Sequence, residues 1–220
     1  MRKEELITGS IYHVFTKSIA GFKIFKNSAE FLRIISVIKY YQKENPSVKF
    51  SQFIKLTEAE KEHKLKTNYL RENANLIEII AYCIMPTHLH FILKQSKDRG
   101  ITIFMNNILN SYTRYFNIRN NRKGPLWEGR FKNVLVKTEE QLLHLTRYLH
   151  LNPVTAYLIN NPMEWEFSSY KEYLLLIDEK NKICKFDDVI KVAADGYSKF
   201  AEDGISYQRD LAIIKKLILE

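Results

Sequence analysis

The sequence predicts an α+β fold of the ferredoxin-like kind, in which helices pack on an antiparallel sheet. Strand-like and helix-like patterns follow one another in the order β-α-β-β-α-β-α, which is typical of that arrangement. Hydrophobic residues make up 45% of the 220 residues, so a sizeable core can be buried. The longest apolar runs are far too short to span a bilayer, and no membrane segment is expected.

The first half of the chain supplies three strands of this sheet. Ile11–Lys17 is rich in β-branched and aromatic residues, which favours a strand. Ser28 is a candidate cap for a helix with a periodic apolar face. Residues 55–73 are highly charged and predict an exposed helix or a long loop. Leu76–Met85 is apolar enough for a central strand, and after a Pro-Thr turn His88–Lys94 predicts the next.

The second half adds two long helices and an edge strand. Ile101–Ile118 has the apolar spacing of a helix, and Arg130–Val136 predicts a short strand. The capping-box pattern Thr138–Gln141 predicts a helix start. We expect that helix to end near Asn152, because the residue before a proline avoids the α region, and a second helix to begin at Pro153.

The charge is unevenly distributed along the chain. The net charge is +9, yet residues 171–220 hold 9 basic and 10 acidic residues, so the surplus lies in residues 1–170. We therefore predict one domain over residues 1–170, which carries the positive surplus, and a mostly helical extension over residues 171–220. A surplus of this size indicates a polyanionic partner, either nucleic acid or an anionic membrane surface.

The cysteine content and the N-terminus point to the cytoplasm. Cys83 and Cys184 lie far apart in the sequence, which excludes a disulfide framework and a cysteine-rich zinc site and fits a reducing compartment. The first residues lead into no apolar segment typical of a signal peptide.

The segment Ser111–Lys137 concentrates basic groups between aromatic rings. It has seven basic residues and one acid, which suits a groove for single-stranded nucleic acid. A solvated helix face whose aromatic rings lie in the core is an equally good interpretation. The candidate DNA-binding residues are Arg114, Arg119, Arg122, Lys123, Trp127, Arg130 and Lys132.

Two histidines form the sharpest local motif. On a strand, His88 and His90 point to the same side, about 6–7 Å apart along the chain. Two such imidazoles can hold one metal ion, although hydrogen-bonded histidines without a metal would look the same in the sequence. Imidazole ligands by themselves favour Zn, Ni or Cu over Mg.

A second group lies on the capped helix. His144, Tyr148 and Asn152 follow one another at intervals of four residues and share a face. Tyr148 is either a nucleophile or an amphipathic ring with its hydroxyl at the solvent edge. Asn152 is either part of a site or the N-cap of the helix expected after it.

Several stretches resemble those of REP-associated tyrosine transposases, in the single-tyrosine branch of the HUH transposases (insertion-sequence-200-like). The resemblance covers roughly the first 170 residues. Thr87 and Lys17 depart from the asparagine and arginine that relatives often carry. The matching stretches, in the family's order, are Ile11–Lys17, Met85–Leu93, Gly124–Phe131, Arg147–Val154 and Trp165–Tyr170.

The resemblance implies an HUH endonuclease core. Tyr148 would be the nucleophile, and His88, His90 and Asn152 would bind a divalent metal, Mg or Mn. Metal proximity or a nearby base such as His144 would assist the loss of the tyrosine proton; the sequence does not choose between them.

The resemblance also implies the reaction. The substrate would be single-stranded DNA beside a hairpin, cleaved and rejoined through a 5′-phosphotyrosine by a transposase, mobile or domesticated. We expect a monomer or homodimer that acts in the cytoplasm at the nucleoid, with no membrane partner. Two alternatives stay open: a catalytically silent module that binds single-stranded nucleic acid, and a metal-dependent phosphodiesterase that uses water.

Overall fold

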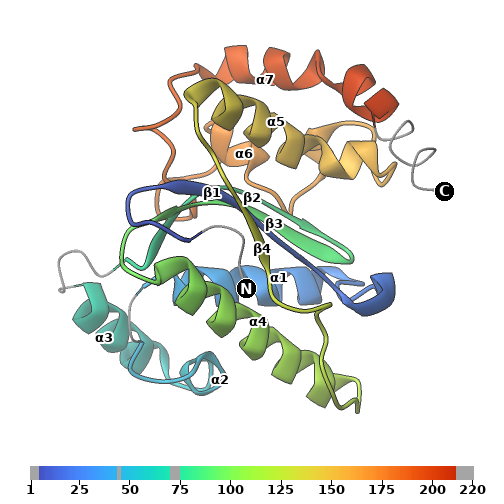
Figure 1. Ribbon diagram of the computed structural model, residues 1–220. Coiled ribbons are helices and arrows are strands. Elements are labelled where there is room, and N and C mark those ends of the chain that lie inside the picture. The colour runs from blue at the N-terminus through green and yellow to red at the C-terminus, as the bar shows by residue number, and fades with distance from the viewer. Residues whose placement is uncertain (1–4, 44–45, 70–74, 212–220) are drawn as a thin grey trace.

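A computed structural model describes residues 5–43, 46–69 and 75–211, without the side chains of residues 65–69. Its centre is one antiparallel sheet with the strand order β2-β3-β1-β4 (Figure 1). This order, reached through two β-α-β halves, confirms the ferredoxin-like α+β fold. The strands are β1 (Ile11–Lys17), β2 (Ile77–Met85), β3 (His88–Gln95) and β4 (Lys132–Leu135).

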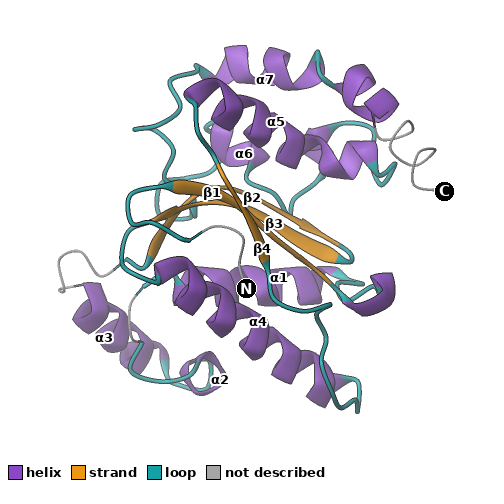
Figure 2. Cartoon of the chain, in the orientation of Figure 1, coloured by secondary structure: helices purple, strands orange, loops and turns teal. Residues whose placement is uncertain are grey.

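Helices cover both faces of the sheet (Figure 2). On one face lie α1 (Ser28–Tyr41) and α4 (Gly100–Arg119), with α2 (Phe50–Phe53) and α3 (Glu58–Tyr69) beside them. On the other face lie α5 (Glu139–Thr155), α6 (Tyr170–Tyr173) and α7 (Ala194–Glu202). Two short 3₁₀ turns occupy Ile19–Gly21 and Pro162–Glu164. β2 is therefore buried on both sides.

The capping signals are confirmed at α5 and displaced by one residue at α1. The Thr138 hydroxyl accepts from the Gln141 N–H at 3.0 Å, and the Gln141 side-chain oxygen accepts from the Lys137 N–H at 2.8 Å. At α1 the cap is Asn27, whose side chain accepts from the Glu30 N–H at 3.2 Å. An asparagine is at least as good a cap as the serine that follows it.

Helix α5 does not end at Asn152, and the expectation of a second helix starting at Pro153 is wrong. The proline removes one hydrogen bond from the helix. The last turn of α5 nevertheless continues because Pro153 and Val154 are buried, and because the Ala156 N–H bonds to the Asn152 carbonyl at 2.9 Å. Asn152 is thus an interior helical residue rather than a cap, and its side chain is available for another role.

Residues 171–211, the described part of the predicted extension, are less helical than expected, and residues 212–220 lie outside the described residues. Residues 174–193 form turns and loops instead of helices. Tyr173, Phe186 and Tyr197 nevertheless belong to the same buried cluster as the sheet. The division of the chain at residue 170 stays a prediction about which part folds by itself. Within the described residues, no helix has the length and hydropathy needed to cross a bilayer.

A buried histidine ties α5 to the sheet and to α7. His150 lies 2.6 Å from the Tyr197 hydroxyl through Nδ1 and 2.7 Å from the Ser169 hydroxyl through Nε2. Ser169 in turn accepts from the backbone N–H of Tyr82 on β2 at 2.9 Å. His150 is fully buried. This network holds the middle of α5 at a fixed height above the sheet.

The burial of His150 predicts a pH dependence of stability. Burial lowers the pKa of His150 from 6.5 to about 3. Below pH 6.5 the unfolded chain binds a proton at this residue that the folded chain does not, so stability falls as the pH falls toward 3. The expected slope is about 1.4 kcal/mol per pH unit for this residue. Urea unfolding from pH 7 to 4 measures it. His150→Gln should reduce the slope; an equal slope in both proteins would contradict the assignment.

Candidate active site at the sheet and helix α5

Strand pairing places both motif histidines on the face that α5 covers. β1 and β3 run antiparallel, with Phe15 opposite His90 and Lys17 opposite His88. On the other side of β3, Cys83 of β2 lies opposite His90. The His88 and His90 rings have centroids 4.9 Å apart and meet edge to face. The predicted convergence of the two imidazoles on one side of the strand is thus present.

Tyr148 reaches this histidine face from α5. Its ring centroid lies 6.1 Å from that of His90 and 6.3 Å from that of His13, in both cases edge-on. The side chain is 38% exposed, so one part packs on the imidazoles while another faces solvent. A substrate approaching from solvent can therefore reach Tyr148 and the histidines together.

Each motif histidine makes a hydrogen-bond contact through its Nδ1 atom. His90 Nδ1 lies 3.0 Å from His13 Nε2, and His88 Nδ1 lies 2.8 Å from the Thr87 hydroxyl. Both contacts use Nδ1, so Nε2 of each motif histidine is left for another partner. If both Nδ1 atoms carry the proton, both Nε2 lone pairs can bind a metal.

His13 was missed by the sequence reasoning as a member of the site. It lies on β1, two residues before Phe15, and its ring stacks on His90 with centroids 5.3 Å apart. The available signal was alternation: His13, Phe15 and Lys17 must share one face of a strand. What the sequence lacked was the register that sets this face beside β3.

Burial keeps the three imidazoles neutral near pH 7. Burial lowers the pKa of His13 to about 4; burial, and then the charge of Lys17, lower the pKa of His88 to about 4. The pKa of His90 is well below its ordinary value, first through burial and then through His88, His13 and Lys17. Neutral imidazoles offer lone pairs, which metal binding requires.

The tyrosine is not activated by its surroundings. Burial, and to a lesser extent the neighbouring Cys83, raise the pKa of Tyr148 above 10. The phenol is therefore protonated at neutral pH and must lose its proton during any attack that it makes.

Asn152 provides the orphaned polar group of the site. It lies one turn after Tyr148 on α5, and its side-chain amide nitrogen is buried with no hydrogen-bond partner among the described residues. Turning the amide by 180° would put its oxygen in that position instead. Within the same residues, no three His, Cys, Asp or Glu side chains form a metal-binding group. A metal site at His88 and His90 would therefore need a further ligand of another kind, and the Asn152 amide is the candidate that the resemblance implies.

His144 faces toward the C-terminal helix. Its Nδ1 lies 3.0 Å from a guanidinium nitrogen of Arg147, and its ring meets the Phe200 ring at 5.5 Å. Phe200 belongs to α7. Because the guanidinium can only donate, Nδ1 accepts this hydrogen bond and the neutral ring carries its proton on Nε2.

The candidate DNA-binding residues separate into different environments. Trp127 is only 8% exposed and donates to the Thr113 hydroxyl at 3.0 Å, so its ring has little face left for stacking with a base. Arg122 donates to the Pro125 carbonyl at 2.7 Å and to Asn117 at 3.0 Å, which fixes the loop after α4. Lys123 is exposed in the same loop. Tyr112 and Phe116 are buried, as the alternative interpretation of this segment expects.

Arg130 and Lys132 lie closest to the histidine face. With Lys17 and Phe15 they line a depression of about 260 Å³ at the β1–β4 edge. The Phe15 ring stacks on His90 with centroids 5.9 Å apart. This depression therefore adjoins the tyrosine and histidine site, whereas Arg114 and Arg119 lie on α4, across the sheet.

Comparison with known proteins shows that this chain is similar to transposases. Residues 52–152, which include all four predicted catalytic and metal-binding residues, match the family described as "Transposase IS200 like". A curated protein of Haemophilus influenzae named as a REP-associated tyrosine transposase is 24% identical over 103 residues. The match covers 42% of this chain and 58% of that protein, so the chain spans a little over half the length of this relative.

A solved structure also matches. It is titled "Structure of the REP associates tyrosine transposase bound to a REP hairpin", and it superimposes with a TM-score of 0.52 at 14% identity. The match covers 87% of this chain and 98% of that chain. At this identity the likeness shows a shared fold.

Proposed function

Since this chain resembles the IS200-like, REP-associated tyrosine transposases, we propose that it is a metal-dependent endonuclease and strand transferase for single-stranded DNA beside hairpins. The observation that carries the proposal is the edge-on contact of the Tyr148 ring with His90, next to His88. In this proposal, Tyr148 as nucleophile and the two neutral imidazoles would meet the same phosphate. The reaction would take place in the cytoplasm, on DNA at the nucleoid.

The Tyr148 oxygen would attack the scissile phosphorus. A bond forms between that oxygen and the 5′-phosphate, the bond to the 3′-oxygen breaks, and the phenol proton leaves. The freed 3′-oxygen takes up a proton and becomes a hydroxyl. A second 3′-hydroxyl can later displace the tyrosine, which conserves the phosphodiester bond without ATP. His144 is our candidate for a base that assists the first step, and its Nδ1 lone pair would first have to leave Arg147.

The donor set fits a divalent cation. His88 and His90 through Nε2, and Asn152 through its amide oxygen, would hold it, and Mg²⁺ or Mn²⁺ is the ion that the resemblance implies. Such an ion neutralises charge on the phosphate and polarises it. All three protein ligands are neutral, so the DNA phosphate itself completes the charge balance. His13 Nε2 would accept a hydrogen bond from the Nδ1–H group of His90, and so keep the Nε2 lone pair of His90 directed at the ion.

The DNA strand would approach across the β1–β4 edge. Lys17, Arg130 and Lys132 line the depression there, beside one acid, Glu128, and each basic group would neutralise a phosphate. Arg130→Gln with Lys132→Gln should flatten the dependence of log affinity on log salt by roughly 1.4, at about 0.7 per phosphate. Fluorescence anisotropy with a labelled hairpin at several salt concentrations measures the slope. A slope equal to that of the wild type would move the binding surface elsewhere.

A denaturing gel separates this proposal from its alternatives. Labelled hairpin DNA incubated with protein and Mn²⁺ should give a cleaved strand and a covalent adduct at the mass of protein plus DNA. Cleavage without an adduct would favour a phosphodiesterase that uses water. Binding with neither product would favour a silent binding module.

A further inference from the structure

A second basic pocket lies on the face of the sheet away from Tyr148. It has a volume of about 430 Å³ and lies where α4 meets α1 and the start of α2. Four cationic side chains line it, Arg33, Lys49, Arg114 and Arg119, and no carboxylate does. Its other lining includes Tyr115 and the polar side chains Ser51, Asn107, Asn110 and Ser111. Positive charge without a counter-charge indicates an anionic ligand.

Arg33 is the organising group of this pocket. Its guanidinium lies over the Phe50 ring at 4.5 Å and over the Tyr115 ring at 4.9 Å. The rings hold the guanidinium plane between them, so its direction is set before any ligand arrives. Its Nε atom is buried and has no hydrogen-bond partner among the described residues. A buried donor left unpaired costs free energy, which a ligand acceptor would recover.

The groups that line the pocket beside Arg33 do not neutralise its positive charge. Arg119 donates to the Tyr115 hydroxyl at 2.8 Å, which fixes the ring that flanks Arg33. Burial lowers the pKa of Arg33 below its ordinary value, and the group stays cationic near neutrality. Arg114 is exposed on α4, at the mouth of the same pocket. Guanidinium groups are suited to phosphate, which they contact through two parallel hydrogen bonds.

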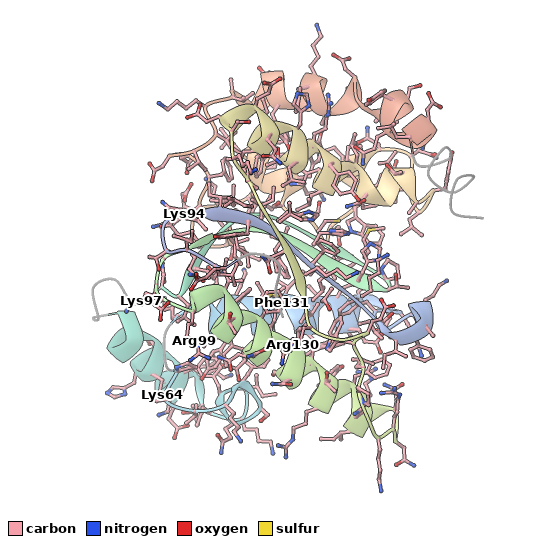
Figure 3. The ribbon with its side chains drawn as sticks, viewed as in Figure 1. Lys64, Lys94, Lys97, Arg99, Arg130 and Phe131 are labelled. Carbon is pink, nitrogen blue, oxygen red and sulfur yellow. The ribbon has the colours of Figure 1, made fainter. Side chains whose placement is uncertain are left out.

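The pocket is linked to the active site by shared lining residues. The depression beside Phe15 shares Gly129 and Arg130 with a larger one of about 990 Å³ along α4, which Arg99 also lines. That depression shares Asn110 with the Arg33 pocket. Figure 3 shows Arg99 and Arg130 on the α4 side of the sheet. A chain of hollows therefore leads from the β1–β4 edge round to Arg33, lined by cationic groups and also by Glu128, Glu5 and Asp98; the Arg33 pocket is the one of the three without a carboxylate.

We propose that the Arg33 pocket binds a backbone phosphate of the DNA substrate at a second point, on the face of the sheet opposite Tyr148. The inference rests on the proposed function for its choice of ligand: the active site takes one segment of the DNA, and the pocket holds a more distant one. Arg33 would contact the phosphate through its guanidinium, and Lys49 and Arg114 would add charge at the mouth. The pocket would thus anchor the DNA without taking part in the chemistry.

The test compares charge removal inside and outside the pocket. Arg33→Gln and Arg114→Gln each remove one positive charge from it, and Lys199→Gln removes one from α7, on the other face of the sheet. Each is measured in the Tyr148→Phe background, so that cleavage does not interfere. The probes are a labelled hairpin with a long single-stranded arm, by anisotropy at several salt concentrations, and inorganic phosphate, by calorimetry.

We expect Arg33→Gln to weaken hairpin binding roughly tenfold, because a hydrogen-bonded ionic contact is lost, and to flatten the salt slope by about 0.7. Arg114 is exposed, so Arg114→Gln should not disturb packing, and it should also weaken hairpin binding and flatten the salt slope. Lys199→Gln should behave as the background protein. If neither pocket variant differs from Lys199→Gln with either probe, the pocket is not a phosphate site.

A third outcome separates DNA from a small ligand. If Arg33→Gln abolishes phosphate binding but leaves hairpin affinity and salt slope unchanged, the DNA assignment is overturned and the pocket takes a small phosphate-bearing molecule. Adduct formation by the protein with Tyr148 intact is scored separately. Its absence would contradict the proposed function, whereas Arg33-dependent binding would still support the pocket.

Discussion

Tyr148→Phe is expected to abolish DNA cleavage and the covalent adduct while hairpin binding persists. The change removes the one oxygen that would attack phosphorus and keeps the ring that packs edge-on against His90 and His13. Among the described residues that hydroxyl makes no hydrogen bond, so the loss of stability should be about 1 kcal/mol or less. Denaturing gels of labelled hairpin DNA measure the adduct, and thermal unfolding checks the fold.

Tyr157→Phe is the matched control for this experiment. Tyr157 follows α5 directly and is 65% exposed, so it is more accessible to DNA than Tyr148. It has no contact with the histidine face in the structure, and its change should leave the adduct intact. An adduct that survives in Tyr148→Phe and disappears in Tyr157→Phe would identify Tyr157, and not Tyr148, as the nucleophile.

His88→Ala and His90→Ala are each expected to abolish cleavage, with binding of the hairpin largely retained. Both remove a neutral imidazole from the set that would hold the cation. Excess chelator should have the same effect on the wild-type protein, and added Mn²⁺ should restore cleavage there but not in the variants. Calorimetric titration with Mn²⁺ gives a readout that does not depend on activity: both variants should bind the ion more weakly than wild type.

The control for the histidine variants is His63→Ala. His63 is an exposed residue of α3, on the far side of the sheet from Tyr148, and its replacement should change neither cleavage nor Mn²⁺ affinity. Cleavage that continues undiminished in excess chelator would remove the cation from the proposal. His88 and His90 would then be left with a purely structural role, held by Thr87 and His13.

Local signals predicted the elements well, and the failures come from tertiary packing. Ile11–Lys17 is a strand with the predicted bounds, because β-branched and aromatic residues alternate there without interruption. Thr138 caps α5 because its hydroxyl reaches an N–H three residues on, a purely local contact. Pro153, in contrast, was expected to end the helix, and burial of that turn against the rest of the protein outweighs the lost hydrogen bond. Residues 171–220 were expected to be mostly helical, but residues 174–193 fold as turns and loops that contribute to the buried cluster.

The sequence by itself drew attention to His88, His90, Tyr148 and Asn152 through their spacing, and the resemblance to a transposase family assigned their roles, because motifs are visible along a chain. The tertiary structure added what depends on register between distant segments. It placed His13 against His90, buried Trp127 in the core, turned His144 toward Phe200, and set Arg33 between two rings. The physical reason is that these contacts join residues from different elements: His13 and His90 are 77 positions apart, and only the pairing of β1 with β3 brings them within hydrogen-bond distance.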